Sequence, residues 1–336
     1  MENKGLMIIN HNIPCSCACR YCFFRSCKKA NGIEYYRGKK IAERFAHWRK
    51  ERGISDFFLC YAISHCADYP ELIDNIEFNK SLDFIGAKYL QINGIRYRDD
   101  LELMHYLEKV KEAGVVYVDT TFYGLERYHD YFANREGDFA NLMNIVKAIK
   151  SVGLTPQPTV FVCEENKNEI SDLIELIREY AGASCKVYTA LQDYRGNGEN
   201  LEEIRLTKQS YEMLPDNVKE TINISRYKTE EEWLKANSFS QYTSRNLLLA
   251  LRPDNIDMLE TMTCDEIINY LVGLDESYYR AIPDIGPLAK LYGNSNCQKL
   301  YRQRDLLWMW QKQYIRDNKL ELHDVTDERL CGSMRF

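Results

Sequence analysis

The sequence lacks the features of a membrane protein or a nucleic-acid-binding protein. No apolar run is long enough to span a bilayer, and the N-terminal stretch MENKGLMIINHNIP has too short an apolar core for a signal peptide. No basic block occurs, and the formal net charge of the 336 residues is −6, so nothing favours a phosphate backbone as a ligand. We therefore expect a cytoplasmic protein in a reducing compartment, with neither nucleic acid nor membrane as a partner.

Cysteine is distributed unevenly along the chain. Five of the twelve cysteines fall between residues 15 and 27, and the stretch CSCACRYC alone holds four. A secreted disulfide scaffold would be small and evenly rich in cysteine. In a reducing compartment, such local density indicates metal or redox chemistry. A zinc site would favour two CxxC pairs, but only Cys19 and Cys22 form such a pair.

Short apolar runs alternate with amphipathic helical segments from residue 6 to about residue 227. The runs that we expect to form strands are 6–9, 57–62, 88–92, 115–119, 159–163, 185–191 and 221–225. The clearest helical segments, 39–51, 100–113, 138–151 and 170–181, are each followed by a glycine within two residues. A helix between successive strands predicts a parallel sheet. We predict an α/β fold, a partial (β/α)6 TIM-like barrel, with a doubly wound sheet as the alternative.

The pattern changes after residue 227. The segments EEEWLKAN, RNLLLAL, CDEIINYLVGL and DLLWMWQKQYIRD read as helices without alternating strands. We therefore divide the chain into a barrel at 1–227 and a helical C-terminal appendage at 228–336. This appendage either packs against the barrel or forms a lid or platform for the substrate.

Three of the clustered cysteines, Cys15, Cys19 and Cys22, follow the spacing Cx3Cx2C directly after the first predicted strand. A cubane iron–sulfur cluster is held by thiolates, usually four, so three ligands leave one iron open to a small molecule. With Tyr21 before the last cysteine and Phe23 after it, the motif resembles that of the radical S-adenosylmethionine (radical SAM) superfamily. Members of this superfamily have a partial (β/α)6 barrel or a close variant, with this loop after the first strand.

The resemblance implies a metal-binding oxidoreductase in which the three motif cysteines hold a 4Fe–4S cluster and SAM binds the fourth iron. One electron, supplied by a donor of the ferredoxin or flavodoxin type, would cleave SAM to methionine and a 5′-deoxyadenosyl radical, which abstracts a hydrogen atom from the substrate. Tyr21 would lie beside the adenine, with Phe23 as the second flanking aromatic. Cys17 and Cys27 fall outside the spacing. We expect Cys17 to be a small loop residue, with an alternative ligand as the other possibility, and Cys27 to be structural or incidental.

The other residues expected to contact SAM have weaker signals in the sequence. Members of the superfamily often carry a GGEP-like segment after the second strand, which contacts the SAM amino group. The segment 93–96 has suitable surroundings but no acidic residue, so Asn93 and backbone carbonyls near Gly94 would accept from the ammonium group. The stretch SHCADYPE at 64–71 is a second candidate. Arg195 either binds the SAM carboxylate or is an ordinary solvated loop arginine.

Three functions remain open at this point. Residues 126–153 resemble the peptide-modifying branch of the superfamily in their HD pair, His129 and Asp130, followed by Gly137 and Phe139. This favours hydrogen abstraction from a peptide or protein. The C-terminal cysteines lack the close spacing of auxiliary clusters, and we expect no leader-peptide-binding domain before the motif; both points favour a small metabolite or nucleotide instead. The third possibility is a non-catalytic zinc or iron–sulfur protein. The sequence identifies no catalytic residue that acts on the substrate.

Overall fold

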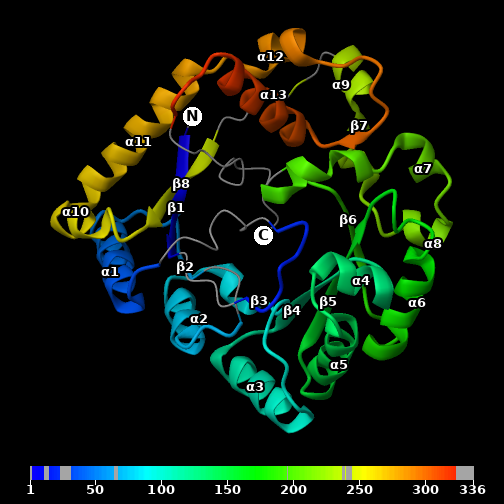
Figure 1. Cartoon of the computed structure of the whole chain (residues 1–336). Coiled ribbons are helices and arrows are strands. Elements are labelled where there is room, and N and C mark those ends of the chain that lie inside the picture. Colours follow the sequence, from blue (N-terminus) through cyan, green and yellow to red (C-terminus); the bar gives the residue numbers. More distant parts are fainter. Residues whose placement is uncertain are drawn as a thin grey trace.

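Parallel strands lie at the centre of the molecule, and helices surround them (Figure 1). The computed structural model describes residues 2–10, 15–22, 32–63, 67–194, 196–236, 239 and 244–322. Within these ranges, none of the helices combines the length and the apolar character that crossing a bilayer requires.

Two parallel sheets form the centre of the fold. The first contains β2 (Phe58–Ala62), β1 (Glu2–Asn10) and β8 (Ser244–Leu251), in that order. The second contains β3 (Tyr89–Gln91), β4 (Tyr117–Phe122), β5 (Thr155–Val162) and β6 (Tyr188–Leu191). Every pairing within these two sheets is parallel. The predicted α/β fold with an open, TIM-like barrel is confirmed.

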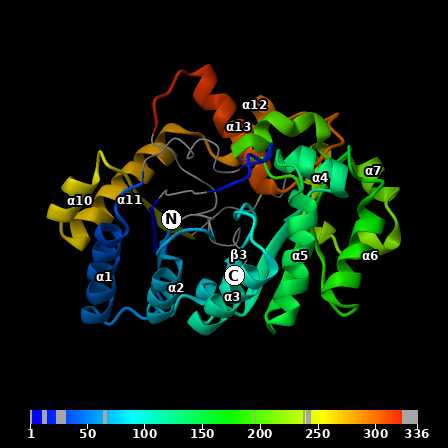
Figure 2. The same cartoon turned by 60° about the horizontal axis from the view of Figure 1, so that its bottom comes forward.

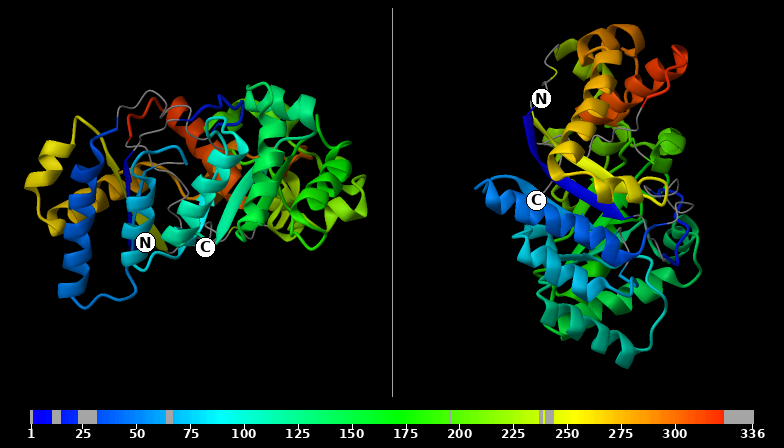
Figure 3. Two further views of the ribbon diagram at one scale, coloured as in Figure 1. Left: turned by 90° about the horizontal axis from the view of Figure 1, so that it is seen from below. Right: turned by 90° about the vertical axis from the view of Figure 1, so that its left-hand side faces the viewer.

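Helices cover the outer side of the strands (Figure 3). They are α1 (Tyr35–Glu51), α2 (Leu72–Ser81), α3 (Asp100–Ala113), α4 (Glu126–Ala133), α5 (Asp138–Ser151) and α6 (Ile170–Ala181). The α3 helix shows how the sequence sets its own ends. The Asp99 carboxylate accepts from the Glu102 N–H at the start, and Gly114, with φ +113°, ends the helix in the left-handed conformation. All four clearly predicted helices are present.

The remaining elements are short or belong to the C-terminal region. Between β2 and β9 lie the 3-10 helices η2 (Ile85–Lys88), η3 (Gly196–Ile204) and η4 (Ile224–Arg226), with α7 (Lys208–Glu212) and α8 (Asp216–Lys219). A small antiparallel pair joins β7 (Lys228–Thr229) to β9 (Leu300–Tyr301). The C-terminal helices are α9 (Glu230–Ala236), α10 (Ile256–Thr261), α11 (Cys264–Ala281), α12 (Ile285–Tyr292) and α13 (Gln303–Asp317).

Two predicted elements are wrong. The segment RNLLLAL forms strand β8 rather than a helix, and it pairs in parallel with β1. Its leucines follow the two-residue alternation of a strand, since Leu247, Leu249 and Leu251 are all buried in the core. Residues 221–225 form no strand of their own; Ile222 makes a single parallel bridge to Thr189. The region after 227 therefore also contributes a strand, and the domain boundary at 227/228 stays a prediction.

The cysteine loop follows β1, at the edge where the C-terminal ends of the parallel strands meet. Active sites of β/α barrels lie at this edge. A hollow of about 900 Å³ lies instead beside the end of α1 and the start of β2, and its lining includes Arg49, Asp56 and Phe57. This hollow is at the opposite ends of the strands, so we look for the site around the cysteine loop.

Candidate functional site

The first motif cysteine packs against the turn that follows β3. The Ser16 N–H donates to the Gly94 carbonyl at 2.8 Å. Gly94 has φ +78°, and a Cβ atom on it would lie 2.3 Å from the Cys15 Sγ atom. Both the backbone conformation and the closeness of the thiol therefore require glycine at this position.

The middle of the cysteine loop is bound to the end of α4 (Figure 2). The Ala18 N–H donates to the Ala133 carbonyl at 3.2 Å, and the Arg20 N–H donates to the Phe132 carbonyl at 2.8 Å. The Arg20 side chain also donates to the Tyr131 carbonyl and lies over the Tyr131 ring. The last carbonyls of a helix have no partner within the helix. The loop supplies these partners and is thereby fixed in place.

The thiols of the loop are close enough to interact. Cys17 shares hydrogen bonds with Cys15 and with Cys19, and Cys19 interacts electrostatically with Cys15 and Cys22. The three motif cysteines are partly exposed, whereas Cys17 is buried. No three His, Cys, Asp or Glu side chains within the described ranges converge on a single-ion site.

The thiols of the loop differ in pKa. The hydrogen bond with Cys17 lowers the pKa of the Cys19 thiol, although burial opposes this effect. For Cys17, the hydrogen bond with Cys15 lowers the pKa, but the bond with Cys19, burial and the charge of Asp138 outweigh it and raise the pKa to about 12. The thiolate is the form that binds metal.

Cys17 belongs to a buried polar network beneath the loop. Its Sγ atom lies 3.6 Å from Asp138 Oδ2, and Arg135 pairs with the other carboxylate oxygen at 3.1 Å. His129 is fully buried, with Nε2 3.2 Å from Asp138 Oδ2 and Nδ1 accepting from the Tyr123 N–H at 3.1 Å. Because Nδ1 accepts, the ring proton lies on Nε2 and is donated to Asp138. In the described geometry, Cys17 contributes to this buried network, and its structural role stays a prediction.

The second residue of the HD pair has a capping role. Asp130 accepts from the Gly137 N–H at 2.6 Å and from the Phe139 N–H at 2.8 Å, and so caps the start of α5. His129 and Asp130 therefore both bond to the start of α5 and shape the turn that follows the end of α4. The sequence indicated this pair, but it gave no sign of the network with Asp138.

Tyr21 connects the loop to the end of β6. Its hydroxyl donates to the Asp193 carbonyl and accepts from the Asp193 N–H, at 3.1 and 2.5 Å. Its ring centroid lies 4.7 Å from that of Phe161, and Tyr123 and Phe132 complete this aromatic cluster. Tyr21 is only 8% exposed, so little of the ring is open to an adenine in this arrangement. The place beside the adenine stays a prediction.

Asn93 connects the turn after β3 to the end of β4. Its Oδ1 atom accepts from the Thr121 N–H at 2.7 Å, and its amide group donates to the Thr121 carbonyl at 2.9 Å. The amide group is therefore engaged with backbone, and the role of Asn93 and Gly94 in binding SAM stays a prediction. Phe23 and Arg195 lie outside the described residues.

The two candidate segments for the SAM amino group contact each other. β3 is the third strand along the chain, whereas the stretch 64–71 follows the second strand, β2. Asp68 from this stretch accepts from the Arg96 N–H at 2.5 Å and forms an ion pair with the Arg98 side chain. Residues 64–66 lie outside the described part of the chain. The count of strands favours 64–71 as the counterpart of the GGEP segment, although Gly94 touches the cysteine loop.

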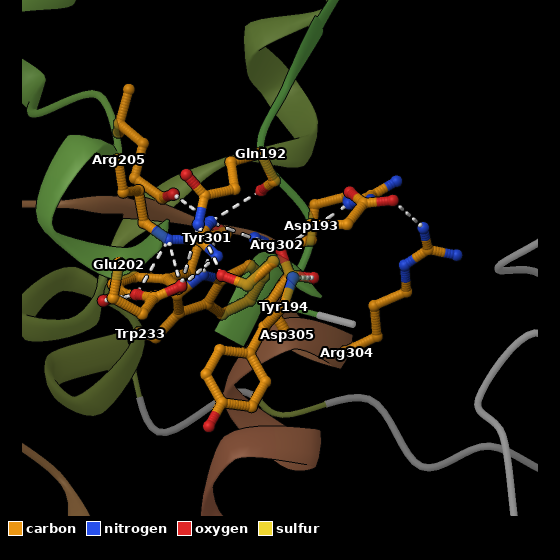
Figure 4. Close-up of polar contacts among 12 residues, drawn as sticks. Gln192, Asp193, Tyr194, Glu202, Arg205, Trp233, Tyr301, Arg302, Arg304 and Asp305 are labelled. Atoms are coloured by element: carbon orange, nitrogen blue, oxygen red, sulfur yellow. Dashed lines mark hydrogen bonds and ion pairs between the residues drawn. The ribbon is translucent and has the colours of Figure 1, made fainter. Parts of the chain in front are cut away.

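Asp193 connects the cysteine loop to the C-terminal region (Figure 4). While its backbone bonds to Tyr21, its carboxylate forms ion pairs with Arg302 and with Arg304, the latter at 2.9 Å. Both arginines lie at or next to the start of α13. No pattern in the sequence predicts this contact, because charged residues at the start of an apolar helix ordinarily lie in solvent.

Arg205 lies in the same cluster of charges (Figure 4). It is 1% exposed, pairs with Glu202 at 2.7 Å, and lies 3.8 Å from Asp305, which is fully buried. Burial raises the pKa of Asp305, but the charges of Arg302 and Arg205 outweigh burial and hold the pKa below its usual value. The cluster contains three cations and three anions: Arg205, Arg302, Arg304, Asp193, Glu202 and Asp305. The positive and negative charges balance, so the cluster buries no net charge. Its ion pairs fix the C-terminal region to the end of β6.

Comparisons with known proteins identify relatives of this chain. Residues 9–177 match the model of the Radical SAM superfamily. The sporulation killing factor maturation protein SkfB of Bacillus subtilis (strain 168) is 25% identical over 142 residues, which are 42% of this chain and 30% of SkfB. The antilisterial bacteriocin subtilosin biosynthesis protein AlbA of the same strain is 24% identical over 192 residues, which are 56% of this chain and 39% of AlbA. The chain thus spans less than two fifths of either relative.

Solved structures show more distant similarity. Native anSMEcpe with bound AdoMet has a TM-score of 0.48 at 13% identity and covers 79% of this chain and 80% of its own. Streptococcus suis SuiB bound to S-adenosylmethionine has a TM-score of 0.40 at 12% identity and covers 56% of this chain and 41% of its own.

Proposed function

Because the chain belongs to the radical SAM superfamily, we propose that Cys15, Cys19 and Cys22 hold the cluster of this enzyme and that its substrate is a peptide or protein. The cofactors of the family are a 4Fe–4S cluster and SAM. When bound, they supply one-electron cleavage of SAM and, through it, abstraction of a hydrogen atom from the substrate. The observation that supports the ligand assignment is the loop itself, with three partly exposed motif thiols at the C-terminal edge of the parallel strands.

The residues around the loop contribute rigidity and exclude water. Gly94 and the end of α4 bind the loop backbone, and the buried carboxylate of Asp138 contacts Cys17 from below. The aromatic cluster under the loop packs against Cys19 and shields this thiol from solvent on one side. Hydrogen bonding and solvent exposure both set the reduction potential of an iron–sulfur cluster. These contacts therefore tune the potential at which an electron donor of the ferredoxin or flavodoxin type would reduce it.

A peptide substrate is supported by the relatives. SkfB is named as a maturation protein of the sporulation killing factor, and AlbA as a biosynthesis protein of the bacteriocin subtilosin. The α4–α5 segment, with His129 and Asp130, carries the local resemblance to the peptide-modifying branch. A small metabolite or nucleotide is the competing substrate class.

The test is anaerobic. The full chain is reconstituted with iron and sulfide, mixed with SAM and dithionite, and analysed for 5′-deoxyadenosine by mass spectrometry. We expect 5′-deoxyadenosine from the unmodified chain and none from Cys19→Ala. A chain that binds neither cluster nor SAM would overturn the proposal.

The substrate class is tested in the same assay. We expect peptides encoded by neighbouring genes to increase the yield of 5′-deoxyadenosine and to change in mass. An increase that follows only the small molecules of a cell extract would overturn the peptide assignment and leave the cofactor chemistry standing.

A further inference from the structure

The interior face of the second sheet carries a row of polar side chains. Gln91 on β3 is the register partner of Asp119 on β4, which is in turn the partner of Gln157 on β5. Register partners on neighbouring strands point to the same side of a sheet. The alternate residues Leu90 and Val118 are buried in the core with residues of the outer helices. The three polar side chains therefore face the inside of the barrel, and all three are partly exposed.

The rows on either side are also polar or aromatic. Towards the cysteine loop, Thr121 and Thr159 are partners, and Thr159 is the partner of Tyr188. In the other direction, the rings of Tyr89 and Tyr117 stack with centroids 4.8 Å apart. The interior of a β/α barrel is ordinarily filled by branched apolar side chains. This face instead offers hydrogen-bonding groups to a bound molecule.

The carboxylate of Asp119 is the one charged group of the row. Among the described residues, no side chain or backbone N–H forms a hydrogen bond or ion pair with it, although its backbone carbonyl accepts from the Ile92 N–H. Burial raises the pKa of Asp119 to about 6. An ionised carboxylate in such surroundings is costly unless a cation or a donor binds it. The row thus has acceptors and negative charge but lacks a cation.

We propose that Gln91, Asp119 and Gln157 form a subsite for a primary ammonium group of the substrate, carried by a lysine side chain. This inference rests on the proposed function, since it names the side chain of the peptide that enters the barrel. An ammonium group has three donors and no acceptor. The row offers a carboxylate in the middle and a carboxamide oxygen on each side, with neighbouring strands about 4.8 Å apart.

The position of the row suits a long side chain. Gln91 ends β3 and lies three residues before Gly94, which contacts Cys15, so the row lies at most roughly 10 Å below the cysteine loop at about 3.3 Å per residue. An ammonium group at the row would therefore have its carbon chain extending towards the cofactor edge. A compact charge on a flexible four-carbon stem is the feature that distinguishes lysine from arginine.

The inference is tested by binding, using two probes with the reconstituted enzyme and SAM. The probes are Nα-acetyl-L-lysine N-methylamide and Nα-acetyl-L-norleucine N-methylamide, which differ in the ammonium group. Titration by saturation-transfer NMR should show at least tenfold tighter binding of the lysine probe, the scale of a charge-assisted hydrogen bond. Asp119→Asn should remove this preference, whereas Asp254→Asn, at a side chain that is 76% exposed, should keep it.

The outcomes separate this inference from the proposed function. Equal binding of both probes to a chain that holds cluster and SAM would overturn the ammonium subsite and leave the proposed function standing. The same holds if Asp119→Asn is folded and keeps the preference. If the chain holds neither cluster nor SAM, the proposed function fails. The same titrations on the full chain without cofactors then still decide whether the row prefers an ammonium group.

Discussion

The Sγ atom of Cys15 lies where a side chain on Gly94 would begin. A Cβ atom at residue 94 would approach this sulfur to 2.3 Å, and the φ angle of Gly94, +78°, lies in the left-handed region. The first motif thiol thus rests directly on backbone of the turn after β3. Since Ser16 also donates to the Gly94 carbonyl, the position of the whole cysteine loop depends on the absence of a side chain here.

Gly94→Ala should therefore impair cluster binding. The new methyl group would displace Cys15, and we expect most of the iron to be lost after anaerobic reconstitution, measured as iron and sulfide per chain. Gly53→Ala is a matched control, because Gly53 has φ +63° but nothing within 4 Å of an added Cβ. This control should keep its iron and lose about 1 kcal/mol of stability from left-handed strain. Full iron content in Gly94→Ala would contradict the packing seen here.

The four cysteines of the loop should separate into three ligands and one structural thiol. Replacing Cys15, Cys19 or Cys22 by Ala should abolish iron binding, because each removes a thiolate of a cluster that has only three. Cys17→Ala should keep the iron and cost roughly 1–2 kcal/mol, since it removes a small buried side chain and its contact with Asp138. Iron content and denaturant unfolding give the two readouts. An intact cluster in the Cys19 variant would disprove the ligand assignment.

Local patterns predicted much of the fold. The predicted helix over 100–113 coincides with α3. Its apolar period lies within the segment, and Gly114, which ends the helix, follows directly after it. The Cx3Cx2C spacing likewise needs only eight residues of sequence. Strands β1 to β6 were expected for a similar reason, since each is a short apolar run between two helices.

The failures came from contacts between distant residues. RNLLLAL is a short apolar run, and such runs do not distinguish a strand from a buried helix. Its partner β1 lies more than two hundred residues earlier, so no local signal marks the pairing. The bond of Tyr21 to Asp193 and the contact of Gly94 with Cys15 also depend on the folded chain. The motif spacing thus predicts three ligands, whereas no local pattern predicts the contacts that hold the cysteine loop in place.

Replacing the buried Arg205, which donates to the Gln192 carbonyl just after β6, should destabilise the protein. Arg205→Met retains bulk but removes one cationic partner of Glu202 and of the fully buried Asp305, and it removes donors to the Gln192 and Leu300 carbonyls. Breaking a buried ion pair typically costs about 3–5 kcal/mol. Urea unfolding measures this loss.

Arg252→Met provides the control for this measurement. The Arg252 side chain is 55% exposed and pairs only at the surface, so the expected change is within about 0.5 kcal/mol. Equal stability of the two variants would show that the charge cluster does not fix the C-terminal region.

Asp119→Asn should make the protein more stable at high pH. Burial raises the pKa of Asp119 in the folded state to about 6, from an ordinary value of 3.8. The folded state therefore holds this proton more tightly, and its relative stability falls as the pH rises from about 4 through 6. A shift of about two pKa units corresponds to about 3 kcal/mol, and asparagine avoids this loss because it does not ionise.

Urea unfolding at pH 4.5 and at pH 8 checks this expectation. The gain of Asp119→Asn over the unmodified chain should be about 1 kcal/mol at the lower pH and should approach its full value at the higher one, whereas Asp254→Asn should show no such trend. A gain that does not depend on pH would mean that the carboxylate is not desolvated. A pH-dependent gain would show that this carboxylate costs the fold stability, as expected of a group whose partner arrives with the substrate.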